Sequence, residues 1–200
     1  RAHDETWPHG GIPSSHYSVD KAAQERLLDE FAADHPEILL TRLRPALTFQ
    51  AAAASEIQRY FLGDLAPVQA LRAVRLPALP VPKGLRVQAV HSADVGRAYA
   101  AAVATRAPGA FNICTDDVLG AQELADLVDH GRFVELPVGA VRAALAAAHR
   151  TGAVPADPGW LDMGMQVPVM DGSRARRELA WEPQHTAAET LRELLAALSE

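Results

Sequence analysis

Apolar residues recur along the chain first at helical and then at strand spacing. Across residues 16–34 they lie three to four positions apart, which predicts an amphipathic helix. The helix positions expected to face the core are Ala23, Leu27, Leu28 and Phe31. A mostly apolar run at residues 38–43, closed by Arg44-Pro45, then predicts a short buried strand. A helix followed by a short apolar strand is typical of a parallel α/β sheet.

The rest of the chain continues this alternation. Strands are predicted at residues 86–90, 110–114 and 133–136, and helices at 51–62, 94–106, 121–130, 139–150, 173–180 and 186–198. Asp94 is expected to cap the helix that it begins, with His91 as a structural hydrogen-bonding residue. The expected inner face of that helix is Val95, Ala98, Tyr99 and Val103. Residues 63–84 and 152–170 are rich in proline or glycine and are expected to form mainly loops.

Composition narrows the classes of function. Hydrophobic residues make up 48% and charged residues 22%, as in an ordinary globular chain, and a net charge of −6 argues against nucleic-acid binding. The single cysteine, Cys114, excludes an internal disulfide, and the eight histidines lack ligand spacing, so no metal site is predicted. No apolar run approaches 18 residues, which predicts no membrane span. We therefore expect a cytoplasmic protein.

Tyr17 and Lys21 form the strongest candidate site. Their spacing of four places both side chains on one face of the predicted helix. An ammonium about 4 Å from a phenolate, at an effective dielectric of ~20, favours the charged form by roughly 4 kcal/mol, or about three pKa units. Such a pair can transfer protons near neutral pH. The chain has 17 Arg but only two Lys, Lys21 and Lys83, so a lysine at position 21 is unusual for this chain.

Six stretches, in this order, resemble the extended short-chain dehydrogenase/reductase family, which includes NAD-dependent epimerases and dehydratases. They are residues 4–8 (Asp-Glu-Thr-Trp-Pro), 17–25 (Tyr-x-x-x-Lys, then Ala-Ala-Gln-Glu), 44–49 (Arg-Pro-Ala-Leu-Thr-Phe), 90–95 (Val-His-Ser-Ala-Asp-Val), 109–113 (Gly-Ala-Phe-Asn-Ile) and 171–183, which end in Trp-Glu-Pro. The resemblance covers the second half of such an enzyme, from just before its active-site helix to its end.

The resemblance implies an α/β fold. We expect the second half of a Rossmann-type doubly wound parallel sheet plus a small mixed α/β substrate lobe, without the N-terminal cofactor-binding half. Residues 1–50 would belong to the Rossmann-like domain and carry the active-site helix. Residues 51–200 would be mainly substrate lobe, with the strand near 86–90 and the helix at 94–106 returning to the Rossmann sheet.

The first residue and a missing motif predict a fragment. The chain begins with Arg1 and contains no Gly-x-Gly-x-x-Gly turn, the motif that cradles the diphosphate of a dinucleotide. We therefore expect that these 200 residues do not bind NAD(P) tightly by themselves.

The resemblance also implies roles for individual residues. Tyr17 would be the general acid/base and would also contact the NAD or NADP cofactor. Lys21 would assist it and contact the nicotinamide ribose. Pro45 and Leu47 would line the nicotinamide pocket. The residues predicted to contact substrate are His16, Trp160 and Met163. Each also has a simpler interpretation, as helix-start polarity for His16 and as packing for the other two.

Two functions remain open on this basis. The first is the C-terminal portion of an NAD(P)-dependent epimerase, dehydratase or reductase that acts on a hydroxyl or carbonyl of a small-molecule substrate, with nucleotide sugars among the candidates. The alternative is a non-catalytic relative that senses or binds a ligand through the same fold. For the first function, the resemblance also implies that the helix at 16–34 could pair with its twin in a homodimer.

Overall fold

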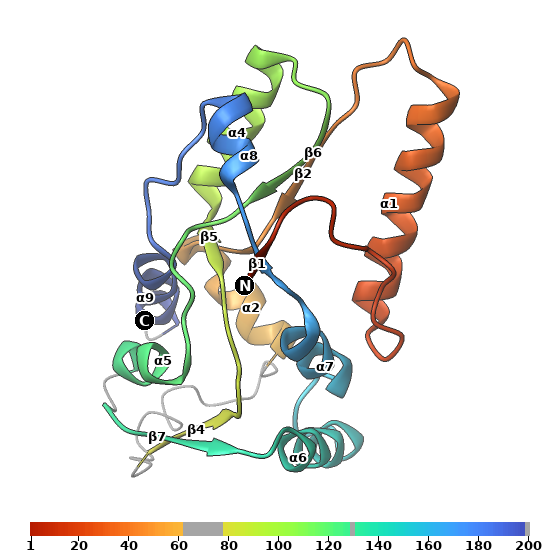
Figure 1. The fold of residues 1–200 in the computed structure, drawn as a ribbon. Coiled ribbons are helices and arrows are strands. Elements are labelled where there is room, and N and C mark those ends of the chain that lie inside the picture. Colours follow the sequence, from red (N-terminus) through yellow and green to blue (C-terminus); the bar gives the residue numbers. More distant parts are fainter. Residues whose placement is uncertain (62–77, 129–130, 199–200) are drawn as a thin grey trace.

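The computed structural model describes residues 1–61, 78–128 and 131–198, where helices alternate with short strands (Figure 1). The strands are β1 (Ala2–His3), β2 (Thr41–Pro45), β3 (Leu47–Phe49), β4 (Leu79–Pro82), β5 (Ala89–His91), β6 (Gly109–Ile113), β7 (Phe133–Leu136) and β8 (Val169–Met170). The helices are α1 (His16–Asp34), the 3-10 turn η1 (Ala51–Ala53), α2 (Ala54–Phe61), α4 (Ser92–Thr105), α5 (Ala121–Leu127), α6 (Val138–Arg150), α7 (Pro158–Gln166), α8 (Ser173–Leu179) and α9 (Ala187–Ala197).

Strands that lie far apart in the sequence pair in parallel. β2 lies beside β6, with Leu43 opposite Phe111, and β3 lies beside β5, with Thr48 opposite Val90. β1 pairs with β8 and β4 with β7, again in parallel. Parallel neighbours require crossover connections, and helices provide them along this chain. The predicted α/β class with parallel strands is confirmed.

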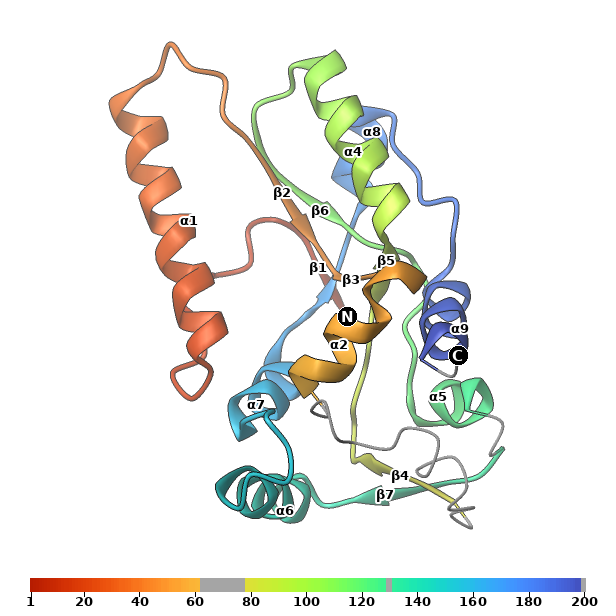
Figure 2. The same ribbon diagram turned by 180° about the vertical axis from the view of Figure 1, so that it is seen from behind.

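Helices lie on both faces of the β2–β6 pair. Both views show α4 and α8 on one side and α1 on the other (Figures 1 and 2). On the α4 side, Phe111 and Ile113 of β6 are fully buried in an apolar cluster. The other buried members of the cluster are Val90, Ala98, Ala102, Ala175, Leu179 and Trp181. Burial of each large apolar side chain stabilises the fold by about 2 kcal/mol. This cluster therefore holds α4 and α8 against the β2–β6 pair.

The predicted inner face of α1 is wrong for two of its four residues, while Ala23 and Leu28 are half-buried. Leu27 is 63% exposed and Phe31 is 39% exposed, and Ala22 is the one buried residue of the helix. The reason is that α1 contacts β2 through charged side chains, described below, and not through an apolar stripe. Hydrophobic periodicity alone therefore indicated a helix correctly but placed Leu27 and Phe31 on the inner face incorrectly.

The predicted cap of α4 is wrong, and its predicted inner face is correct for Val95 and Ala98 but wrong for Tyr99 and Val103. His91 caps the helix, because its Nδ1 accepts a hydrogen bond from the backbone N–H of Ala93 at 3.2 Å. Asp94 is instead fully buried on the inner face with Ala98 and Ala102. Tyr99 and Val103 are 58% and 78% exposed. The hydrogen bonds that Asp94 makes to the C-terminal segment decide which side of α4 turns inward.

Residues 158–166 form α7 where a loop was predicted. Asp157 caps the helix, since its Oδ1 accepts a hydrogen bond from the backbone N–H of Gly159 at 2.6 Å, and Pro158 occupies the first helical position. These start signals were present in the sequence but were outweighed by the glycine and methionine that follow.

Some predicted boundaries move, and some lie outside the described residues. The strand predicted at 38–43 runs instead from Thr41 to Pro45. Of the predicted loop at 63–84, residues 63–77 lie outside the described part, and residues 79–82 form β4. β5 and α4 pack against β3 and β2, but the division into two domains at residue 50 stays a prediction. No helix in the described ranges is long and apolar enough to cross a bilayer.

Candidate active site

Tyr17 and Lys21 lie in the first two turns of α1, whose beginning is held firmly. Ser15 caps the helix by accepting a hydrogen bond from the backbone N–H of Ser18, and the Ser18 hydroxyl accepts one from the backbone N–H of Ile12 at 3.0 Å. Gly11 has a left-handed φ of 81°, and a Cβ there would lie 3.1 Å from the Cβ of Ala22. The segment that precedes α1 is therefore packed directly against the helix that carries Tyr17 and Lys21.

The phenol and the ammonium share one exposed surface, as the spacing predicted. Tyr17 is 47% exposed, and the Lys21 Nζ lies 5.6 Å from the centre of the Tyr17 ring. Lys21 also donates a hydrogen bond to Gln24 Oε1 at 3.1 Å. Both side chains are thus exposed while lying one helical turn apart.

Trp160 of α7 lies beside the Tyr17 ring. The two ring centroids are 5.2 Å apart and the planes are tilted by 33°. The backbones of α7 and α1 approach very closely here, because a Cβ at Gly159 would overlap the carbonyl oxygen of Ser14. Glycine is therefore required at position 159 to bring Trp160 this near to Tyr17.

A bidentate ion pair ties α6 to α7 and, through Ser14, to the start of α1. Arg142 Nε and Nη2 donate to the two carboxylate oxygens of Asp162 at 2.8 and 2.9 Å. The Arg142 hydrogen bond lowers the pKa of Asp162 below its usual value, and the hydrogen bond from Ser14 adds to this. The contact between Trp160 and Tyr17 is thus supported from three elements.

The other predicted site residues lie on separate elements. His16 is exposed at the first position of α1, and Met163 is half-buried on α7, one turn after Trp160. Pro45 ends β2 and Leu47 begins β3, and both are exposed. β2 runs opposite to α1, so its carboxyl end lies toward the end of α1 that carries Tyr17 (Figure 1). The structure brings Tyr17 against both Lys21 and Trp160, while the roles of all seven residues stay predictions.

A charged cluster that the sequence reasoning missed attaches α1 to β2. Glu25 binds Arg44 through two hydrogen bonds of 3.0 and 2.6 Å and Arg42 through one of 3.0 Å. Arg42 also pairs with Asp29 at 2.6 Å. Arg42 and Arg44 are two apart on a strand and so share one face, which was a usable signal. The interpretation of residues 38–43 as a buried apolar strand concealed it.

Glu25 makes the attachment of α1 sensitive to acid. Burial alone would raise the pKa of Glu25, but the hydrogen bond from Arg44 and the charges of both arginines bring it below the ordinary value of 4.5. A carboxyl with a lowered folded-state pKa stabilises the fold above its unfolded pKa, and this contribution is lost as pH falls through the folded value. We expect Glu25→Gln to reduce the free energy of unfolding at neutral pH by about 2 kcal/mol.

Urea unfolding at neutral pH and below pH 4 measures this effect. The difference between the Glu25→Gln variant and the original chain should shrink in acid, because the original then loses the same ion pairs. Glu30→Gln is the matched control, since Glu30 is exposed on the same helix. A difference that stays constant across this pH range would contradict the assignment.

Comparison with known proteins shows the fold. No protein-family model matches the chain, and no curated protein does. Solved structures do match: RMD from Pseudomonas aeruginosa complexed with NADPH, at 17% identity and a TM-score of 0.59, covers 99% of this chain. UDP-glucose-4-epimerase from Stenotrophomonas maltophila with bound NAD has 18% identity, a TM-score of 0.61 and 98% coverage. A mutant of UDP-glucuronic acid 4-epimerase from Bacillus cereus, in complex with a fluorinated UDP-sugar and NAD, has 15% identity, a TM-score of 0.64 and 99% coverage.

The chain spans 60%, 57% and 56% of the lengths of these three structures. The fold expected from the resemblance to NAD-dependent epimerases and dehydratases is therefore confirmed over nearly the whole chain. At these identities the likeness concerns the fold alone.

Proposed function

We propose that this chain is the part of an NAD(P)-dependent epimerase, dehydratase or reductase that carries the acid/base group. The reaction would be hydride transfer to or from a hydroxyl or carbonyl carbon of a small-molecule substrate. The observation that carries the proposal is the exposed Tyr17 phenol with Lys21 one turn away, on a helix whose first turn is packed against α7. The shared fold with structures that hold NAD or NADPH supports it.

Tyr17 would exchange a proton between its Oη and the substrate oxygen as hydride moves at carbon. Lys21 places a positive charge on the same face, 5.6 Å from the Tyr17 ring centre, where it would contact the nicotinamide ribose. Lys21 donates one of its hydrogen bonds to Gln24. Its remaining N–H donors are available for a ribose hydroxyl.

The residues present fit one end of a nicotinamide dinucleotide. Tyr17 and Lys21 are exposed on α1, and Pro45 and Leu47 are exposed where β2 ends and β3 begins, which suits the nicotinamide and its ribose. The chain contains no Gly-rich strand-to-helix turn, so none of its residues forms the usual cradle for the diphosphate. When bound, the nicotinamide supplies or accepts the hydride.

His16, Trp160 and Met163 are the proposed substrate contacts. Trp160 is the best supported of the three, because its ring lies against Tyr17 and its helix is anchored by the Arg142–Asp162 pair. Structures with this fold include epimerases named for UDP-sugars, which supports a sugar nucleotide as one substrate class. The exposed Leu27 and Phe31 support the predicted pairing of α1 with a second copy.

Replacing Lys21 with Met tests the proposed acid/base pair. Without the ammonium, Tyr17 loses the cation 5.6 Å from its ring centre, and the proposed contact to the nicotinamide ribose is lost as well. Turnover near neutral pH should fall about tenfold or more. The measurement is NAD(P)H-dependent turnover of the complete protein with nucleotide-sugar and simple carbonyl substrates.

Lys83→Met is the matched control, because Lys83 is the other lysine of the chain and is exposed beyond β4. It should leave the turnover unchanged. If Lys21→Met turns over as fast as the original protein, Tyr17 and Lys21 do not act as a pair and the proposal is wrong.

A further inference from the structure

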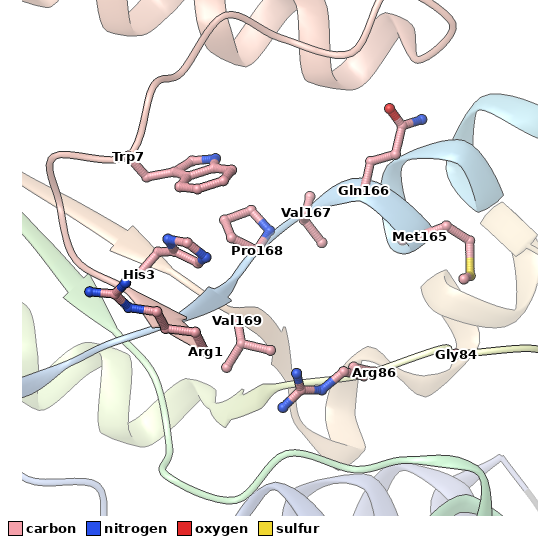
Figure 3. A pocket seen from close by; sticks show the side chains of 11 residues that line it. Arg1, His3, Trp7, Gly84, Arg86, Met165, Gln166, Val167, Pro168 and Val169 are labelled. Carbon is pink, nitrogen blue, oxygen red and sulfur yellow. The ribbon is translucent and has the colours of Figure 1, made fainter.

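A pocket of about 240 Å³ lies at the C-terminal end of α7, one to two turns beyond Trp160. Three separate segments form its walls (Figure 3). His3 and Trp7 come from the lead-in to α1, residues 164–169 from the end of α7 and from β8, and Arg86 from the segment before β5. Nothing in the proposed acid/base chemistry accounts for this pocket.

Backbone pairing holds the three segments together. β1 pairs with β8, which places His3 opposite Met170, and the backbone N–H of Asp171 donates to the His3 carbonyl at 2.8 Å. The Gln88 side chain bonds both backbone groups of Met170, at 2.7 Å to the N–H and 3.1 Å to the carbonyl. The walls are therefore fixed relative to one another without a ligand, which is a property of built binding sites.

The lining is positively charged. It includes the guanidinium groups of Arg1 and Arg86 and contains no aspartate or glutamate among the described residues. Arg86 has no hydrogen-bond or ion-pair partner within the described part of the chain. Asp4, the acid closest in sequence to Arg1, accepts a hydrogen bond from the backbone N–H of Thr6 at 3.0 Å and is not part of the lining. An arginine left without a carboxylate favours an anionic ligand.

An aromatic and apolar surface adjoins this charge. The rings of His3 and Trp7 are 3.9 Å apart, and Trp7 is 44% exposed. Pro168 and Val169 lie between this aromatic pair and Arg86 (Figure 3). Such a surface suits a ring on the ligand, since aromatic faces bind sugar or aromatic rings by apolar contact.

The volume limits the size of the ligand. Pockets for drug-sized molecules measure roughly 300–1,000 Å³. At about 240 Å³ this pocket suits a single ring with one charged group, not a whole dinucleotide. We propose that it binds the anionic end of the substrate, as a carboxylate or phosphate carried on one ring. The assignment to substrate depends on the proposed function, whereas anion binding does not.

The test uses three small probes: phenyl phosphate, benzoate and the neutral analogue phenol. Calorimetry gives the affinity, and the indole N–H resonances of Trp7, Trp160 and Trp181 in an NMR titration give the location. We expect saturable binding of one or both anions in the millimolar range, a shift of the Trp7 resonance without a shift of Trp181, and weakening by added salt. Whichever of phenyl phosphate and benzoate binds more tightly shows whether the pocket prefers a phosphate or a carboxylate.

Arg86→Gln should weaken binding of the preferred anion about five- to tenfold. Arg177→Gln, on the exposed side of α8, is the matched control and should leave the affinity unchanged. Binding no stronger than that of phenol, or an equal effect of the two variants, overturns the proposal. Because the probes are not turned over, Tyr17→Phe should keep their affinity, so failure of the pocket and failure of the catalytic proposal give different results.

Discussion

Replacing Tyr17 with Phe should lower turnover of the complete protein by about 10²–10⁴-fold, the usual loss when a general acid/base is removed. The substitution removes the Oη that would hold the transferred proton and keeps the ring that contacts Trp160 at 5.2 Å. Affinity for NAD(P) should change little, because Lys21, Pro45 and Leu47 remain. The measurements are steady-state kinetics and a separate NADH or NADPH titration.

Tyr99→Phe is the matched control for this experiment. Tyr99 is 58% exposed on α4 and lies outside the candidate site, so its hydroxyl should not matter. Equal turnover by the Tyr17→Phe variant and the original protein would sink the assignment of Tyr17. It would favour the alternative of a relative that binds a ligand through this fold without chemistry.

Replacing Asp94 with Ala should cause the largest loss of stability, about 3–5 kcal/mol. The Asp94 carboxylate is fully buried and accepts hydrogen bonds from the backbone N–H groups of Gln184 and His185 at 3.1 and 3.0 Å. It also pairs with the His185 ring at 3.1 Å and with Arg97. Alanine would leave these part-buried donors without the Asp94 acceptor, and each buried unsatisfied group costs about 1–3 kcal/mol.

Thermal unfolding measures this loss, and for a chain of this size we expect the Tm to fall by about 10 °C. Asp94→Asn should be milder, because its side chain retains one acceptor oxygen. Asp20→Ala, on the exposed surface of α1, is the control and should shift the Tm very little. An Asp94→Ala variant as stable as this control would show that the contacts to residues 184 and 185 contribute little.

Local patterns predicted most of the elements. The helices at 16–34, 173–179 and 187–197 and the strands at 109–113 and 133–136 were recognisable from spacing, caps and breakers. The parallel class followed from their alternation. The loop predicted over α7 failed because Gly159, Gly164 and two methionines outweighed the cap formed by Asp157 and Pro158.

The orientation of the helices was less predictable. Both α1 and α4 turn a partly polar face inward, through Glu25 in the first and Asp94 in the second. Each carboxylate finds its partners far along the chain, at residues 42 and 44 and at residues 184 and 185. Hydrophobic periodicity treats such positions as outward-facing, so it assigned Leu27 and Val103 to the core incorrectly.

By itself, the sequence determined the α/β class, the helix that carries Tyr17 and Lys21, and the placement of both residues on one face of it. These are short-range properties, set by helical geometry and by residues within one or two turns. Only the tertiary structure decided that Trp160 lies against Tyr17, that Glu25 attaches α1 to β2, and that His3, Arg86 and Pro168 surround one pocket. These contacts join residues tens of positions apart, and their partners are chosen by the packing of the whole chain.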